Sequence, residues 1–325
     1  MELLKKLTST DSVSGNEGAV RGLIISEIRE LCDEYYTDPM GNLIARIKGD
    51  GERIMLAAHM DEIGVMVTHI DKNGFLRFSA VGGLYTKELP HRRVRFSNGT
   101  VGVIGSEEET FDEKPDIKKL YIDIGAKDRE QAEAHVGIGD TAAFDGETLV
   151  CGSRIISKAL DDRAGCYMLI RAMRELQKPK NDLYFVFTTQ EEVGLRGAKA
   201  AAYAVDPKYA IAVDVTDTGD TPSAPVMDVR LGGGAAIKVM DRSIMCDADI
   251  RCAMIEAAKE NGIKYQLEIM ADGGTDAGAI HLTRAGVKTG GISLPTRYVH
   301  SPAETADRSD LEACVKLLIA AAERL

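Results

Sequence analysis

The sequence has no long hydrophobic run and no excess of positive charge. Near its start, Lys5 and Lys6 interrupt an apolar run with helical spacing, so we expect a small packed helix there rather than a signal peptide or a membrane span. The formal net charge is −11, whereas nucleic acids and anionic membranes bind clustered lysine and arginine side chains. We therefore expect neither a nucleic acid nor a membrane as a partner.

Disulfide bonds and cysteine-based motifs are not indicated either. No two of the six cysteines have the C-x-x-C spacing of a metal knuckle or a redox motif. A chain of 325 residues, 44% of them hydrophobic, can bury a core large enough to fold without disulfide bonds. We expect reduced, mostly buried thiols and, with no signal peptide, a cytoplasmic location.

Strand-like and helix-like segments alternate at both ends of the chain, which predicts an α/β fold. Apolar strand-like runs cover residues 42–47, 53–58, 182–188 and 209–213. Helical patterns cover about 18–31, 169–176, 250–258 and 311–322. Ser14-Gly-Asn-Glu17 and Ser309-Asp-Leu-Glu312 have the form of capping boxes before the first and last of these helices.

The composition changes between about residues 62 and 150. Short β-like runs dominate this part, and Gly, Asn and Asp separate them, with one short helical candidate near residues 128–134. We therefore expect an α/β domain formed by residues 1–62 and 151–325, with an all-β module inserted at residues 63–150.

Polar residues gather where predicted strands end, which is where open α/β sheets place their sites. His59 and Asp61 follow one strand and share a face, so Asp61 can hold one ring nitrogen while the other binds a metal. An ordinary hydrogen-bonded turn is the alternative. Asp161 and Asp162 are adjacent carboxylates, and either they cap the next helix or one of them bridges two cations.

The same pattern recurs further along the chain. Glu191 and Glu192 follow the most hydrophobic strand, so one can hold an ion while the other takes a proton from water; a solvated loop is the alternative. Asp214 ends another buried strand and needs a partner or a metal there. His300 lies in the loop before the last helix, either as a second imidazole ligand or as a structural residue.

Taken together, these residues are more informative than each one alone. Two histidines, two aspartates and a glutamate form a mixed nitrogen and oxygen set that suits zinc, cobalt or manganese better than calcium. Two ions that share a carboxylate can polarise a carbonyl and activate water together.

The motifs also occur in a familiar order, and they resemble those of the TET and glutamyl-aminopeptidase family of dinuclear metallopeptidases, some members of which carry endoglucanase labels. The similarity covers nearly the whole chain, including the β insertion. The motifs that carry it are AHMDEIG, KALDDRAG, TTQEEVGLRGA, AVDVTDTGD and PTRYVHSPAE.

This resemblance implies a role for each candidate residue. Asp161 would bridge the two ions. His59 and Asp214 would complete one metal site, and Glu192 and His300 the other. Glu191 would be the general base, Asp61 would orient His59, and the peptide between Asp161 and Asp162 would be cis. The seven residues concerned are His59, Asp61, Asp161, Glu191, Glu192, Asp214 and His300.

The fold implied by the resemblance is α/β. A mixed-sheet zinc-peptidase domain of the phosphorylase/hydrolase-like type would occupy residues 1–62 and 151–325, with a barrel-like dimerisation domain at 63–150. Each subunit would bind two divalent metal ions, zinc or cobalt, with manganese as an alternative. The subunits would form a homo-oligomer, either a dimer or a tetrahedral dodecamer of such dimers.

The predicted function is a metallo-aminopeptidase that removes N-terminal residues from peptides. Its rivals are a dinuclear amidase, deacylase, carboxypeptidase or deblocking peptidase, a glycoside hydrolase and a scaffold without activity. Two carboxylates could serve a glycoside hydrolase, but the two histidines would then have no role. The scaffold is disfavoured because every expected ligand and the base are present.

Two further segments bear on substrate preference. Arg92 stands where the family more often has glutamine. If the loop that carries Arg92 reaches the pocket of a neighbouring subunit, the arginine alters the charge of that pocket. The Gly-rich segment from Asp272 to Asp276 either lines the substrate pocket or only turns the chain.

Overall fold

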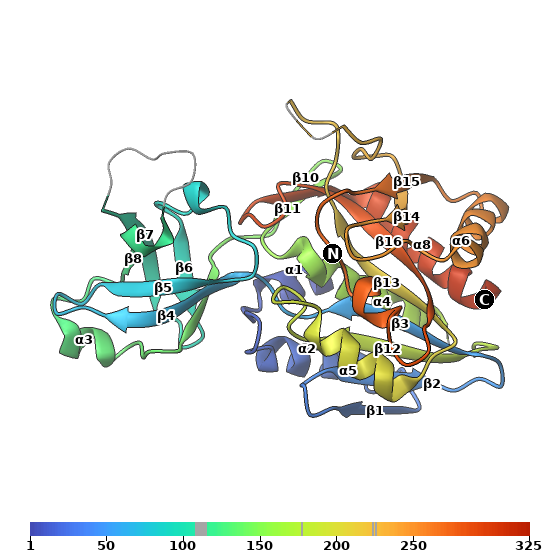
Figure 1. The fold of residues 1–325 in the computed structure, drawn as a ribbon, viewed down its shortest axis with the longest axis horizontal. Helices are drawn as coiled ribbons and strands as arrows, with labels where there is room; N and C mark the ends of the chain where they lie inside the picture. The colour runs from blue at the N-terminus through green and yellow to red at the C-terminus, as the bar shows by residue number, and fades with distance from the viewer. Residues whose placement is uncertain (108–115, 177, 223, 225) are drawn as a thin grey trace.

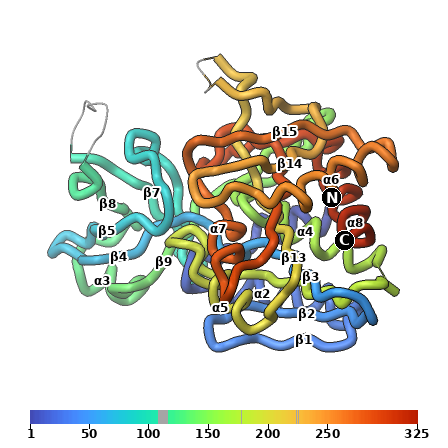
Figure 2. The backbone as a smooth tube through the Cα atoms, turned by 45° about the vertical axis from the view of Figure 1, so that its right-hand side comes forward, coloured from blue at the N-terminus to red at the C-terminus, as the bar shows by residue number. Residues whose placement is uncertain are grey.

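Two β structures organise the chain in the computed structural model, which describes residues 1–107, 116–176, 178–222, 224 and 226–325 (Figure 1). One is a large mixed sheet, and the other is a closed barrel built from the middle of the sequence. In both ribbon and tube views the barrel lies to one side of the sheet (Figure 1, Figure 2). The predicted α/β fold with an inserted barrel is therefore confirmed.

The large sheet has eleven strands in the described part of the chain, and two of them, β14 and β15, extend it from β16. In spatial order the others are β1 (Glu34–Thr37), β2 (Leu43–Ile47), β12 (Asp182–Thr188), β3 (Arg53–His59), β13 (Tyr209–Thr216), β16 (Lys288–Arg297), β17 (Glu304–Asp307), β11 (Arg154–Ser157) and β10 (Leu149–Cys151). The side pair is β14 (Ala235–Met240) and β15 (Tyr265–Ile269).

Four central strands, β12, β3, β13 and β16, run parallel to one another. Their side chains alternate between the two faces, and both faces are apolar, as a parallel sheet covered on both sides requires. On β3, for example, Leu56 belongs to the core on one face and Met55 to the core on the other. The carboxyl ends of the four strands therefore meet at a single edge of the sheet.

Helices cover both faces. One core contains apolar side chains of α1 (Glu2–Ser9), α2 (Gly18–Ile28), α4 (Leu160–Glu175), α6 (Ala248–Glu260) and α8 (Arg308–Arg324). The opposite core contains those of α5 (Arg196–Val205) and α7 (Ala277–Ile280). None of the helices in the described ranges is long and apolar enough to cross a membrane.

The barrel closes around its own apolar core, which includes Val65, Phe78 and Ile122. Its strands in spatial order are β4 (Gly64–Ile70), β5 (Leu76–Val81), β8 (Leu120–Asp123), β7 (Val101–Ser106), β6 (Arg93–Phe96) and β9 (Thr141–Phe144). The short helices η1 (Thr86–Glu88), η2 (Ile117–Lys119) and α3 (Arg129–Glu133) lie in its connections.

A buried ionic cluster fixes the point where the chain leaves β3 for the barrel. Glu62 receives a hydrogen bond from Lys158 at 2.6 Å and one from Arg163 at 3.1 Å. Arg163 also donates to the main-chain carbonyls of Leu7 and Met60, so it ties the first helix to this junction. These buried charges are paired, which is the condition under which such groups are tolerated.

The six cysteines are all unpaired, as expected. The expectation that they are mostly buried is only half correct. Cys166, Cys246 and Cys314 are buried and Cys32 is half-buried, whereas Cys151 and Cys252 are exposed.

Candidate metal centre

The parallel strands bring the candidate residues to one edge of the sheet. His59 is the last residue of β3, and it is paired in register with Thr188 at the end of β12. Glu191 and Glu192 lie three and four residues after Thr188, and Asp214 lies near the end of β13, next to β3. This placement follows from strand direction, because the carboxyl ends of neighbouring parallel strands lie together.

Two triads of potential ligands result, and they share one aspartate. His59, Asp161 and Asp214 form the first triad, and within it the His59 Nε2 atom lies 2.9 Å from Asp161 Oδ1 and 3.9 Å from Asp214 Oδ1. Asp161, Glu192 and His300 form the second, in which His300 Nε2 lies 3.3 Å from Asp161 Oδ2 and 3.2 Å from Glu192 Oε2. The two carboxylate oxygens of Asp161 thus face different triads.

The adjacent aspartates divide the two roles that the sequence left open. Asp161 faces the triads, whereas Asp162 accepts hydrogen bonds from the main-chain N–H groups of Gly165 at 2.9 Å and His59 at 3.2 Å. Asp162 therefore satisfies one backbone donor in the first turn of α4, as a capping residue does, and another at the end of β3. The peptide bond between the two aspartates is cis.

The electrostatics of the site follow from crowded, buried carboxyl groups. Burial and the charge of Asp161 raise the pKa of Asp214 well above its usual range. Burial acts against protonated histidine, but hydrogen bonds to Asp161 and Glu192 raise the pKa of His300 to about 12. Burial likewise raises the pKa of Glu191, against the attraction of His59. Bound cations would offset the repulsion among these crowded carboxyl groups, so the site favours cations as ligands.

These residues fit a pair of divalent cations. The Glu192 Oε1 atom is buried and has no hydrogen-bond partner among the described residues, which is costly for a carboxylate unless a cation is bound. The Nδ1 atom of His59 lies 3.0 Å from the main-chain oxygen of Asp61. A carbonyl oxygen only accepts, so Nδ1 donates and the Nε2 lone pair is left free to bind a metal.

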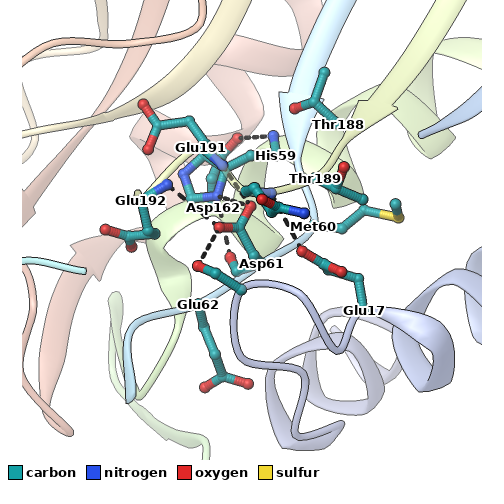
Figure 3. Close-up of polar contacts among 12 residues, drawn as sticks. Glu17, His59, Met60, Asp61, Glu62, Asp162, Thr188, Thr189, Glu191 and Glu192 are labelled. Carbon is teal, nitrogen blue, oxygen red and sulfur yellow. Dashed lines mark hydrogen bonds and ion pairs between the residues drawn. The ribbon is translucent and has the colours of Figure 1, made fainter. Parts of the chain in front are cut away.

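The carboxylate of Asp61 makes a different set of contacts (Figure 3). It accepts hydrogen bonds from the main-chain N–H of Glu191 at 3.0 Å and of Glu192 at 3.2 Å, and from the Ser14 hydroxyl at 2.6 Å. Its distance to His59 Nδ1 is 3.6 Å. The main chain of Asp61 thus contacts His59, while its carboxylate contacts the Glu191–Glu192 backbone.

The sequence analysis missed the part that the N-terminal segment takes in this site. Ser14 is not a helix cap, because α2 begins at Gly18 and its N-terminus has no side-chain cap from Ser14. The hydroxyl of Ser14 binds Asp61 instead, and the Glu17 carboxylate accepts from the main-chain N–H of Gln190 at 3.2 Å. The capping-box pattern hid these contacts, which join segments far apart in sequence.

A cavity of about 440 Å³ opens onto both triads. The connection between the barrel strands β5 and β6 supplies Gly83 and Tyr85 to its wall, and residues 272–275 of the Gly-rich segment form another part. The pocket-lining interpretation of that segment is therefore confirmed for these four residues. Arg92 instead lines a smaller hollow beside His300 and Ser301.

Comparison with known proteins identifies the family. A family model described as M42 glutamyl aminopeptidase matches residues 41–317. The chain is also 56% identical to a protein of Acetivibrio thermocellus assigned as an aminopeptidase, over 98% of this chain and 97% of that protein. The chain belongs to the M42 glutamyl aminopeptidase family.

Other M42 relatives agree over the full length of the chain. The lysyl aminopeptidase of Pyrococcus furiosus is 38% identical, over 100% of this chain and 97% of that protein. The solved TET1 peptidase of Pyrococcus horikoshii, which can assemble into a tetrahedron or a large octahedral shell, has a TM-score of 0.91 and 38% identity, covering 100% of this chain and 99% of that chain.

The family and activity expected from the motifs are thereby confirmed. This M42 chain is an aminopeptidase, a hydrolase that acts on peptides, in a family of metallopeptidases. Its two triads are candidate metal ligands.

Proposed function

We propose that this aminopeptidase uses two divalent ions, zinc or cobalt with manganese as an alternative, to hydrolyse the first peptide bond of a substrate. The single observation that carries this proposal is the pair of triads that share Asp161 at the wall of one cavity. His59 and Asp214 would hold one ion together with Asp161. Glu192 and His300 would hold the other.

When bound, a pair of divalent cations supplies a Lewis acid that polarises the substrate carbonyl and lowers the pKa of water. The chain's own residues do the rest. The Glu191 carboxylate lines the cavity, takes the proton of the attacking water and returns it to the departing amine. Asp61 keeps Glu191 in place through the main-chain hydrogen bond at 3.0 Å.

Turnover of aminoacyl-arylamides with free or acetylated amines, after loading with zinc, cobalt or manganese, tests this function. We expect cleavage only of substrates with a free amine, and its loss in the presence of a chelator. Cleavage confined to acetylated substrates would move the assignment to a deacylase or deblocking enzyme. No cleavage of any substrate by protein that binds both ions would contradict the proposal.

We further propose that the chain forms a homo-oligomer, with residues 63–150 as an inserted dimerisation domain and residues 1–62 and 151–325 as the catalytic domain. The likeness to TET1 supports an assembly of dimers such as a tetrahedral dodecamer. Analytical ultracentrifugation separates a monomer, a dimer and a dodecamer. A cytoplasmic location is favoured by the unpaired cysteines, and cell fractionation tests it.

A further inference from the structure

The second triad depends on a residue with little support from regular structure. His300 lies in the connection between β16 and β17, and its backbone is left-handed, with φ of 64°. By contrast, His59 ends a central strand of the sheet. A non-glycine residue in the left-handed region stays there only when its surroundings hold it. Some other group must therefore fix the main chain of His300.

Glu304 provides such a contact. Its Oε1 atom accepts a hydrogen bond from the main-chain N–H of His300 at 3.0 Å, and its Oε2 atom accepts one from the main-chain N–H of Asp161 at 3.1 Å. One carboxylate thus spans two residues of the second triad that are far apart in sequence.

The position of Glu304 is itself well defined. It is the first residue of β17 and pairs in register with Ser157 of β11, so the sheet fixes its main chain. Its side chain is only 2% exposed. The position therefore acts as a rigid support for the loop that carries His300.

These contacts use both oxygens of the Glu304 side chain. Within the described residues, the hydrogen-bond partners of Glu304 are main-chain N–H groups, and no lysine or arginine pairs with it. Burial of a carboxylate without a strong cationic partner is costly, so a structural role alone would favour an uncharged side chain. Glutamine has a single acceptor oxygen, and its NH₂ group would face the second main-chain N–H.

We propose that Glu304 is a positioning residue for the second triad. Its carboxylate fixes the main chains of His300 and Asp161, so that the His300 ring and the Asp161 carboxylate converge with Glu192 on one point. This inference rests on the proposed metal site, but its test counts bound ions and does not require peptide hydrolysis.

The test measures zinc binding by Glu304→Gln and wild-type protein over a series of buffered free zinc concentrations, with bound zinc counted by mass spectrometry. Loss of a residue that orients a metal ligand typically weakens metal binding by about 10- to 100-fold. We expect a loss of that size for the ion that Glu192 and His300 would hold. The other ion keeps His59 and Asp214 and shares only Asp161 with the second triad, so its affinity should fall less. Cobalt loading adds a second readout, because visible absorption reports the geometry of each ion.

Asp310 offers a matched control. It is also fully buried, and its two carboxylate oxygens accept from the main-chain N–H groups of Gly232 at 2.6 Å and Gly234 at 2.8 Å, outside both triads. Asp310→Asn therefore reproduces the loss of a buried, amide-bridging carboxylate elsewhere in the fold. We expect it to bind both zinc ions as the wild type does.

The outcomes separate clearly. The inference is overturned if Glu304→Gln binds two zinc ions with wild-type affinity. It is also overturned if the affinity for both ions falls equally. If Glu304→Gln does not fold, Glu304→Asp keeps the charge but is too short to reach both amides, and the same selective loss is expected. A wild type that binds two ions but cleaves no peptide would refute the proposed function while leaving this inference intact.

Discussion

Replacing Asp61 by asparagine separates its two contacts with the site. The main-chain oxygen of Asp61 accepts from His59 Nδ1, and the substitution leaves that oxygen in place. The side-chain carboxylate accepts from the main chains of Glu191 and Glu192, and the substitution changes that contact. The structure therefore predicts that Asp61→Asn keeps both metal ions and loses catalytic rate.

The size of the loss follows from the hydrogen bonds. An asparagine side chain has one acceptor oxygen, so at least one of the two main-chain N–H groups loses its partner. A buried donor left without a partner costs about 1–3 kcal/mol. If the lost hydrogen bond displaces Glu191 and raises the activation free energy by that amount, kcat falls by roughly 5- to 150-fold.

The assay combines kcat on an aminoacyl-arylamide with the zinc content of the same protein. Ser14→Ala is the milder comparison, because it removes only the 2.6 Å hydrogen bond to Asp61 and keeps both main-chain contacts. We expect its kcat to fall less than that of Asp61→Asn. Loss of a zinc ion from Asp61→Asn, or an unchanged kcat, would refute the reasoning.

Three further predictions concern the cavity and its ions. Gly83→Ala adds a Cβ 2.9 Å from His300 Nδ1, so the zinc content should fall from two ions towards one. Gly137→Ala is the control, because the nearest atom to its added Cβ is 3.7 Å away, and it should retain two ions. Equal zinc contents in the two variants would contradict this prediction. The cavity wall carries Asp217 and Asp272 and, among the described residues, no lysine or arginine. Arylamides of lysine should therefore be cleaved roughly tenfold faster than those of glutamate. Faster cleavage of the glutamate substrate would exclude this preference. A chelator should lower the melting temperature in calorimetry, because bound ions stabilise the fold by about 4 kcal/mol at 1,000 times their Kd; an unchanged temperature would argue against buried ion sites.

The strands that carry the site were the most predictable part of the fold. Residues 182–188 were predicted as a strand and form β12 with the same bounds, because a continuous apolar run flanked by polar residues is typical of a buried parallel strand. By contrast, β16 was not predicted from its sequence, KTGGISLPTR. Its glycines follow from packing, since a Cβ on Gly290 would lie 2.7 Å from Ile250 and 2.9 Å from Met254.

Both capping predictions were wrong for a common reason. A capping box is a local pattern, but the hydrogen bonds that form depend on groups elsewhere in the chain. The residue that caps α8 is Asp307, which accepts from the main-chain N–H of Ser309, while Glu312 pairs with Arg171. Glu304 was likewise not recognised, because its partners, at the start of α4 and in the connection before β17, meet only in the fold.

The seven candidate residues could be proposed from sequence because their order and local context are distinctive. The fold brings six of them to one cavity wall, and Asp61 lies buried behind it. The contacts that hold these residues in place could not be predicted, because they join segments that are far apart in the sequence. In the proposed mechanism, Glu191 moves the proton while its neighbour Glu192 holds an ion.

The most direct test of that claim is to measure bound zinc and kcat for Glu191→Gln and Glu192→Gln side by side. General acid–base catalysis contributes about 10²- to 10⁴-fold, so Glu191→Gln should bind two ions and lose that much of kcat. Glu192→Gln should bind the second ion weakly. A Glu191→Gln enzyme with near-normal kcat, or one that has lost its ions, would contradict the assignment.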